Sequence, residues 1–265
     1  FAEYKTRSFD ARYINYLYPG TFDQALGQQL SQLPLDQIFA SENIKKKDGF
    51  VIEEGTQPQD AYQGTNLLTA GYVSAAMPLG KFDVSLGFRG EYNIQTLTAT
   101  TNTGKVDVNN PIFAPLPSLN VAYNVSDRSL IRAAYGRTVN RPEFRELAPF
   151  LYYQFEYEAG IFGSTTLKTA FINNIDLRYE FFPNPGEMLS IGTFYKTIQN
   201  PIETYLQITS ETPQLYYGNA ESATDVGIEL EFRKSLAGLG MSKILRNTSF
   251  NLNAALIKSE VNVGT

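Results

Sequence analysis

Residues 81–95 read KFDVSLGFRGEYNIQ, and apolar and polar side chains alternate along this stretch. Because successive side chains of a β-strand point to opposite faces, the alternation places an apolar set and a polar set on separate faces of one strand. The apolar set consists of Phe82, Val84, Leu86, Phe88, Tyr92 and Ile94. The polar set consists of Asp83, Ser85, Arg89, Glu91, Asn93 and Gln95. This strand is longer than the usual 5 to 6 residues and reaches the roughly 9 to 11 that cross a bilayer at a tilt.

The same alternation recurs along the chain, most clearly in the runs that begin at Leu119, Ile175, Val226 and Phe250. We predict about nine strands, of which three alternate poorly, those near residues 8, 71 and 193. The nine are centred near residues 8, 71, 89, 121, 133, 178, 193, 226 and 253. The fold class is therefore all-β, with an antiparallel sheet built from hairpins.

The predicted connections are short at one end of the strands and long at the other. Residues 77–81, 124–128 and 182–187 contain the Gly, Pro and Asp residues of tight turns. A longer turn or short helix is expected at 234–245. The long connections are roughly 14–62, 96–116, 139–172 and 200–216, and a short helix interrupted by Pro34 is expected in the first. This asymmetry is typical of outer-membrane β-barrels, whose long loops face the outside of the cell.

The composition excludes several classes of function. The chain has no His and no Cys, so the usual catalytic triads and the thiolate and imidazole metal sites are excluded. A net charge of -5 argues against a nucleic-acid partner, which needs clustered Lys and Arg. We therefore expect no catalytic residue, no metal ligand, no cofactor and no enzymatic activity.

Alternation alone is compatible with two architectures. In a soluble β-sandwich, such as a carbohydrate-binding module, the apolar faces would form one closed core. In a membrane barrel the apolar faces meet lipid and the charged faces line the lumen. The lumen-facing set would be Arg89, Glu91, Asp176, Arg178, Glu180, Glu229, Glu231 and Arg233. Since closed bacterial barrels have an even number of strands, about nine strands predict that further strands complete the wall.

Several ordered segments carry a family resemblance. They are LPSLN at 116–120, YGRTVNRPEFRELAPF at 135–150, NIDLRYE at 174–180, PNPGE at 183–187, SIGTFYK at 190–196 and NPIE at 200–203. With these segments, most of residues 116–234 resembles TonB-dependent outer-membrane receptors, above all those of Bacteroidetes.

The resemblance implies a 22-stranded transmembrane barrel filled by an N-terminal plug domain. Such receptors take up iron chelates, cobalamin or glycans, powered from the inner membrane through TonB. Residues 1–265 would then be a single fragment of the barrel domain, without the plug domain, the TonB box and the C-terminal strands. Expected partners are outer-membrane lipid, the plug domain (which the lumen-facing set would contact), TonB and a surface lipoprotein. The expected location is the bacterial outer membrane, and a structural subunit of an outer-membrane assembly is the alternative.

The long connection at 139–172 contains the candidate ligand contacts, Arg145, Tyr152, Tyr153 and Tyr157. These tyrosines, with Phe155, either stack on a ligand or form an aromatic girdle at the lipid boundary, and the girdle is favoured. Tyr216 and Tyr217 have the same two interpretations.

Glu143 and Glu146 form a carboxylate pair that suits acid-base or metal chemistry. The favoured interpretation is local, with Arg141 and Arg145 bridging to these two carboxylates to hold the loop at the barrel mouth.

Overall fold

In a computed structural model, the structure describes residues 1–17, 24–44, 49–154, 156, 159–208, 213–237 and 248–264. One antiparallel sheet of nine strands dominates it, in the order β1-β4-β5-β6-β7-β10-β11-β14-β15. The nine strands are β1 (Ala2–Asp10), β4 (Ala61–Leu79), β5 (Phe82–Thr101), β6 (Gly104–Ser126), β7 (Ser129–Asn140), β10 (Ala170–Phe181), β11 (Met188–Gln199), β14 (Ser222–Ser235) and β15 (Ser249–Asn262). All nine predicted strands are confirmed.

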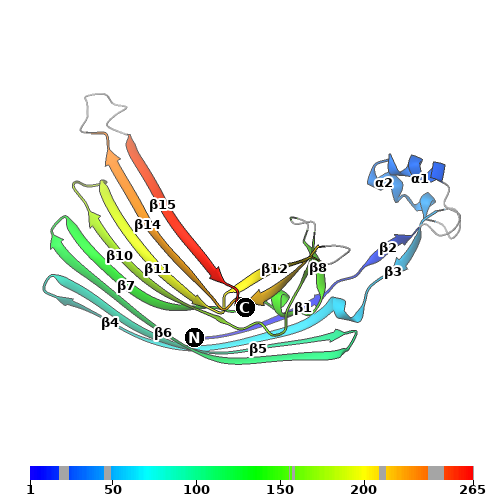
Figure 1. Cartoon of the computed structure of the whole chain (residues 1–265), viewed down its shortest axis with the longest axis horizontal. Helices are drawn as coiled ribbons and strands as arrows, with labels where there is room; N and C mark the ends of the chain where they lie inside the picture. The colour runs from blue at the N-terminus through cyan, green and yellow to red at the C-terminus, as the bar shows by residue number, and fades with distance from the viewer. Residues whose placement is uncertain are drawn as a thin grey trace.

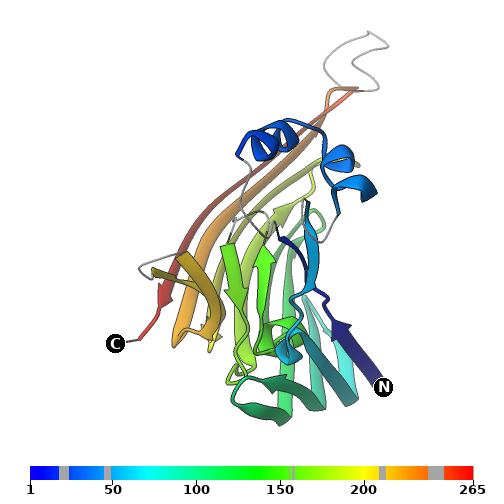
Figure 2. The ribbon, with the colours of Figure 1, turned by 90° about the vertical axis from the view of Figure 1, so that its right-hand side faces the viewer.

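The sheet is an open arc. Strands β1 and β15 are its two edges, and Figure 2, turned by 90° from Figure 1, shows them at opposite ends of the arc. Each neighbouring pair is antiparallel, so the sheet is a hairpin meander with a concave and a convex face. The predicted fold class, a partial antiparallel barrel wall, is confirmed.

The three predicted tight turns lie together at one end of the wall (Figure 1). Gly80, between β4 and β5, has φ +63°, and Gly186, between β10 and β11, has φ +79°, a region in which side chains with a Cβ are strained. Most of the expected turn at 234–245 falls on residues 238–247, outside the described residues.

The long connection predicted at 96–116 is wrong. Strand β5 continues to Thr101 and β6 starts at Gly104, so the two form one long hairpin with a two-residue turn. The alternation continues here but changes phase, because the apolar residues Leu97 and Ala99 follow the odd-numbered positions that are polar at 83–95. The apolar residues lie on one face only as far as Ile94, so the alternation predicts that the strand ends there.

The connection from β1 to β4 forms an arm that extends beyond the wall (Figure 1). It contains the ribbon β2 (Ile14–Leu17) and β3 (Val51–Glu54), the helices α1 (Gln24–Ser31) and α2 (Leu35–Ile38), and the 3-10 turns Ser41–Asn43 and Pro58–Asp60. Pro34 caps the start of α2, so the predicted interruption of a short helix is confirmed. Among the described residues, no helix has the length and apolar character needed to cross a membrane.

A second sheet lies over the concave face of the wall (Figure 1). Its strands are β12 (Ile202–Ile208), β13 (Pro213–Asn219), β9 (Ala159–Phe162) and β8 (Leu151–Gln154), in that order, and we call it the inner sheet. The short helix α3 (Phe144–Leu147) connects it to β7. The main apolar cluster joins wall and loop, with Leu97 and Val108 from the wall and Leu147 and Phe150 from the loop. The core of the described structure therefore lies at the rim of the wall.

Candidate functional site

The convex face of β4, β5 and β6 has an apolar band next to the tight turns. In β5 the band runs from Phe82 to Ile94, which at about 3.3 Å per residue and a tilt of about 45° spans roughly 28 Å. A lipid-facing band of a barrel is about 25 Å tall. Phe88 in this band is 47% exposed and Phe113, across from Tyr92, is 59% exposed. The band therefore fits the hydrocarbon core of a membrane.

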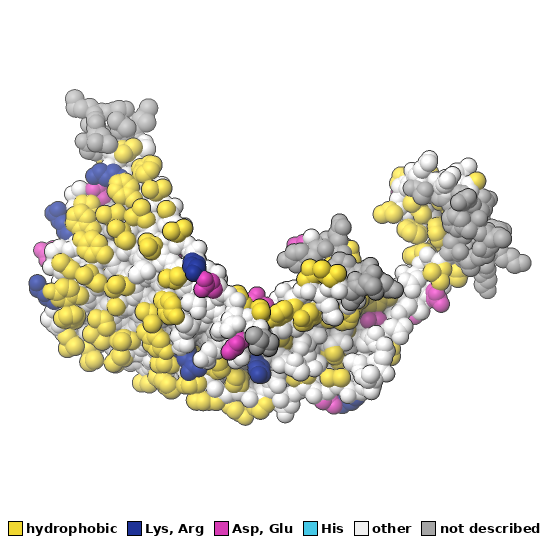
Figure 3. All heavy atoms as spheres, viewed as in Figure 1, with side chains coloured by type: hydrophobic (Ala, Val, Ile, Leu, Met, Phe, Trp, Pro, Cys, Tyr) yellow, Lys and Arg dark blue, Asp and Glu magenta, His cyan; other side chains and the backbone are white. Residues whose placement is uncertain are grey.

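Above the band, the convex face becomes polar. Thr65 and Thr96 share a 2.7 Å hydrogen bond, and the Thr98 hydroxyl donates to Asp107 over 2.9 Å. Figure 3 shows hydrophobic side chains gathered over the wall toward the tight turns and few of them toward the rim. The prediction of the soluble sandwich, one closed core between the apolar faces, is wrong.

The concave face of the wall is polar at the height of this band. All eight residues of the predicted lumen-facing set lie on this face, since they have the same alternation and register. Arg178 donates to Glu229 across the intervening strand over 3.2 Å. The residue between them is Gly192, which has no side chain in the path.

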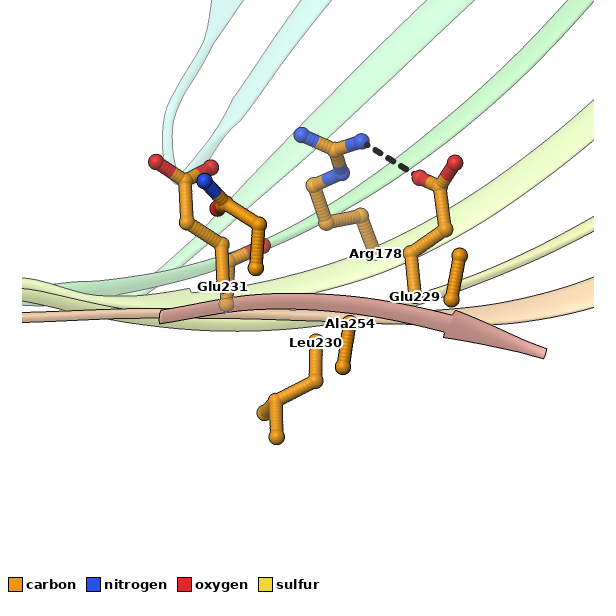
Figure 4. A pocket seen from close by; sticks show the side chains of 8 residues that line it. Arg178, Glu229, Leu230, Glu231 and Ala254 are labelled. Carbon is orange, nitrogen blue, oxygen red and sulfur yellow. Dashed lines mark hydrogen bonds and ion pairs between the residues drawn. The ribbon is translucent and has the colours of Figure 1, made fainter. Parts of the chain in front are cut away.

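Figure 4 shows this separation of faces directly. Arg178, Glu229 and Glu231 project to one side of the sheet, and Leu230 and Ala254 project to the other. Further along, Arg132 pairs with Glu180 at 3.6 Å and Arg233 pairs with Glu231 at 3.1 Å. Asp176 lines a hollow of this face beside Lys196. Whether these groups contact a plug domain remains a prediction.

Glu91 is the centre of the best-buried ionic cluster in the described structure. Its carboxylate accepts from Arg89 at 2.7 Å and from Arg141 at 2.6 Å, and the glutamate is 7% exposed. The predicted bridges from Arg141 and Arg145 to Glu143 and Glu146 are wrong, because Arg141 pairs with Glu91 on the wall and the Arg145 guanidinium lies over the Tyr152 ring.

A second polar contact beside this cluster fixes the same loop. The Gln95 amide donates to the Pro142 carbonyl over 2.8 Å. Residues of β5 thus hold the loop by a charged contact at Glu91 and a neutral one at Gln95.

Glu143 and Glu146 cap the start of helix α3. The backbone N–H of Glu143 donates to the Glu146 carboxylate over 2.8 Å, and the Glu143 side chain accepts from the backbone of Glu146. Burial raises the pKa of Glu146. The described residues contain no cluster of acidic side chains that would hold a metal ion. The two glutamates are therefore structural caps.

The helix α3 and the loop after it pack on the concave face beside Gly64 and Leu97. Phe144 lies over Gly64, where a Cβ would meet its ring. A Cβ on Gly163 would collide with the carbonyl oxygen of Ala148, which is backbone and cannot rotate away. Leu147 and Phe150 are buried against the wall. The loop thus packs closely against the concave face of the wall.

The predicted aromatic run divides into residues with different environments. The hydroxyl of Tyr152 is 2.7 Å from that of Tyr217, and the Arg145 guanidinium lies 4.8 Å from the Tyr152 ring centre. Burial, and then the bond to Tyr217, raise the pKa of Tyr152. Tyr153 is 52% exposed and lines a cavity at the rim.

These positions test one of the two interpretations of the tyrosines, the aromatic girdle. Tyr152, Tyr216 and Tyr217 lie in the inner sheet on the concave side, so the favoured prediction of a lipid-boundary girdle is wrong for them. Tyr157 and Phe155 lie outside the described residues.

Two cations of β1 line a separate cavity on the concave face, although the sequence analysis did not identify them. Lys5 and Arg7 line a cavity of about 570 Å³ together with Arg141 and Arg145. We call it the cationic cavity. Lys5 and Arg7 are two residues apart, which places them on one face, but only the pairing of β1 with β4 shows that this is the concave face.

Comparisons with known proteins agree with this geometry. The chain matches the outer membrane protein beta-barrel family over residues 3–264. Among curated proteins, none matches the chain. Among solved structures, it is similar to the siderophore receptor PirA from Pseudomonas aeruginosa, with 17% identity, a TM-score of 0.50, and coverage of 76% of this chain and 44% of that one.

Two further structures share the fold. The ferric citrate transporter FecA has 16% identity and a TM-score of 0.56, with 76% of this chain and 27% of that one covered. The hemophore receptor HasR of Serratia marcescens has 12% identity and a TM-score of 0.54, with 69% and 34% covered. The chain spans less than half the length of each of the three structures.

The family match covers nearly the whole chain, and the lipid-compatible convex face and ionic concave face are what such a protein requires. The chain belongs to the outer membrane protein beta-barrel family and is an outer-membrane protein.

Proposed function

We propose that this chain is part of the barrel wall of a TonB-dependent receptor, which binds a scarce nutrient outside the cell and imports it with energy delivered through TonB. The observation that carries the proposal is the ionic concave face opposite the lipid-facing band. Arg178 and Glu229 have side chains that are 42% and 47% exposed on this face. Charged groups at membrane depth face a lumen or another protein, because exposing them to lipid is costly.

A plug domain would use these exposed groups. Polar side chains at membrane height offer hydrogen bonds and ion pairs to a folded domain inside the barrel. The edges β1 and β15 still have unpaired backbone groups, and in a membrane such groups require further strands. We propose a 22-stranded barrel of which the nine strands are one part.

We propose the class of the imported nutrient from the chemistry of this chain and from its similarity to solved structures. The similar structures include a siderophore receptor and a ferric citrate transporter. Iron chelates, cobalamin and glycans are the candidate classes, and the wall acts by binding and not by catalysis.

Crosslinking tests the plug in the full-length protein. A photoreactive amino acid replaces Glu229 on the concave face, and the matched control replaces its neighbour Ile228 on the convex face. We expect the Glu229 probe to crosslink within the chain to a separate domain, identified by mass spectrometry, and the Ile228 probe to label lipid. A Glu229 probe that reacts only with solvent would contradict a plugged lumen.

Uptake tests the energy source. Cells that produce the full-length receptor, with and without TonB, are given a panel of labelled ferric chelates, cobalamin and oligosaccharides. We expect accumulation of one class only when TonB is present, while surface binding persists without it. Accumulation that is equal in both strains would indicate a passive pore.

A surface lipoprotein partner remains a prediction, and the arm is where we would look for it. The arm extends beyond the wall, and Leu17, Leu35 and Ile52 are exposed on it. Copurification of a lipoprotein that is lost when residues 14–54 are shortened would support this partner and would also favour the alternative of an assembly subunit.

A further inference from the structure

A second cavity, of about 630 Å³, lies between the base of the arm and the inner sheet. We call it the rim cavity. The base of the arm contributes Tyr13, Gly55, Gln57, Gln59 and Asp60, and β8, β9 and β13 contribute the opposite wall. The cavity lies next to the loop after α3, because Phe150 lines the cavity and is also part of the apolar cluster.

The lining of the rim cavity is aromatic and amide-rich. Four rings line it, those of Tyr13, Phe150, Tyr153 and Phe162. Three glutamine side chains line it as well, those of Gln57, Gln59 and Gln214. No Lys or Arg is among its described lining residues. The cationic cavity differs in this respect, since four cations line it.

The polar groups of the rim cavity differ in what they can offer a ligand. Asp60 is already used, because its carboxylate accepts from the backbone N–H of Gln57 at 2.6 Å and the residue is buried. Gln57 is also used, as a cap of the turn that follows it. Within the described part of the chain, the amides of Gln59 and Gln214 have no hydrogen-bond partner. Gln59 comes from the base of the arm and Gln214 from β13, and each side-chain amide can donate and accept.

This combination selects a ligand class. An anionic chelate gains nothing from a lining without cations, and a purely apolar ligand would leave the amides unpaired, which costs binding energy. A pyranose ring has a C–H face that packs on an aromatic ring and hydroxyl groups that pair with amides. A neutral sugar satisfies both kinds of lining group.

We propose that the rim cavity binds a neutral carbohydrate, whose C–H faces pack on Tyr153 and Phe162 and whose hydroxyls pair with Gln59 and Gln214. The inference rests on the proposed receptor function, since it assigns a substrate class to that receptor. Binding and uptake are separate measurements, so the two proposals can fail separately.

The test uses the full-length receptor purified in detergent. An array of neutral oligosaccharides, including maltoheptaose, xylohexaose and cellohexaose, identifies a binder, and calorimetry measures its Kd. We expect Tyr153→Ala and Gln214→Ala each to weaken binding of that oligosaccharide at least tenfold. Both positions are at the surface of the inner sheet, so the barrel should keep its heat-modifiable migration on gels.

Two matched controls separate the cavity from its surroundings. Tyr179→Ala removes an aromatic ring from the convex face, and Arg7→Ala removes a cation from the neighbouring cationic cavity. We expect both variants to keep the oligosaccharide Kd within twofold.

Three results would overturn the inference: no neutral oligosaccharide binds, binding persists in both cavity variants, or Arg7→Ala weakens binding as much as Tyr153→Ala. If TonB-dependent uptake of another ligand class is found at the same time, the receptor function stands and only the carbohydrate site fails. If an oligosaccharide binds but nothing is imported, the site stands and the transport proposal fails.

Discussion

The β5–β6 hairpin has two parts: a lower part near the tight turns, which in β5 ends at Ile94, and an upper part beyond it. The two parts have opposite polarity on the same two faces. In the lower part, the convex face is apolar and the concave face carries Arg89 and Glu91. In the upper part, the convex face carries Thr98 and Asp107, and the concave face carries Leu97 and Val108. The backbone and register are continuous, so the change is caused by what each face contacts. Lipid outside and a polar lumen favour one pattern, and water outside with a packed loop inside favours the other.

The largest expected effect is at the upper concave face. Leu97→Ala leaves a cavity beneath Leu147 and Phe150, and such changes cost about 2 to 5 kcal/mol. We expect the loop at 141–169 to become sensitive to limited proteolysis in the full-length protein. Ser85→Ala, on the same face but lower in the wall, is the control and should leave digestion unchanged. Equal resistance in the Leu97 variant would mean that the loop is held without this cluster.

The second-largest expected effect is the loss of stability when an arginine is introduced on the convex face, which should depend on its height. Leu86→Arg places a charge in the apolar band, where the cost is about 2 to 4 kcal/mol, and Thr98→Arg places the same charge above it beside Asp107, where the cost is about 0 to 1 kcal/mol. The urea midpoint of the barrel in lipid vesicles should fall clearly for the first variant only. Similar midpoints for the two would remove the distinction between the two parts.

A smaller effect is expected where the two parts meet. Arg141→Met removes a charge-assisted bond to Glu91, which keeps Arg89 as a partner, and such bonds contribute about 1.5 to 3 kcal/mol. Hydrogen exchange should rise in residues 141–150 and stay low in β5. The control is Arg233→Met, whose ion pair is largely exposed and is worth about 0 to 1 kcal/mol. Unchanged exchange in the loop would show that its apolar contacts alone hold it.

The smallest effect is at the turn end. The hydrogen bond from Lys234, and then that from Asn184, hold the pKa of Glu187 below its ordinary value of 4.5. A carboxyl with a lowered folded-state pKa stabilises the fold above its ordinary pKa, and this contribution is lost as the pH falls through the folded value. We expect the protection factors of amides in residues 182–188, which correct for the intrinsic pH dependence of exchange, to fall below about pH 4.5 in the native protein and to be independent of pH there in Glu187→Gln. A pH response that survives in this variant would assign it to another group.

Sequence alternation clearly predicted six of the nine strands, all but those near residues 8, 71 and 193. It also predicted the face of all eight charged residues, because lipid and lumen impose two constant environments over the height of the membrane. It missed the upper part of the β5–β6 hairpin because the apolar set changes from Ile94 to Leu97, and hence from one face to the other. The Arg141–Glu91 pair was not predictable because it joins residues 50 positions apart, and only strand register brings them together. The rim cavity has the same origin, since Tyr13, Tyr153 and Gln214 come from three separate connections between strands of the wall.

Cysteine scanning along the convex face of β5 tests most directly whether the boundary after Ile94 is the membrane surface. The chain contains no Cys, so each substitution introduces the only thiol within it. Full-length receptors with Cys at Leu86, Tyr92, Thr98 or Thr100 are treated in intact cells with a membrane-impermeant maleimide. We predict strong labelling at Thr98 and Thr100 and none at Leu86 and Tyr92. Labelling of Leu86 as strong as that of Thr98, in a protein that remains folded, would contradict a lipid-facing wall.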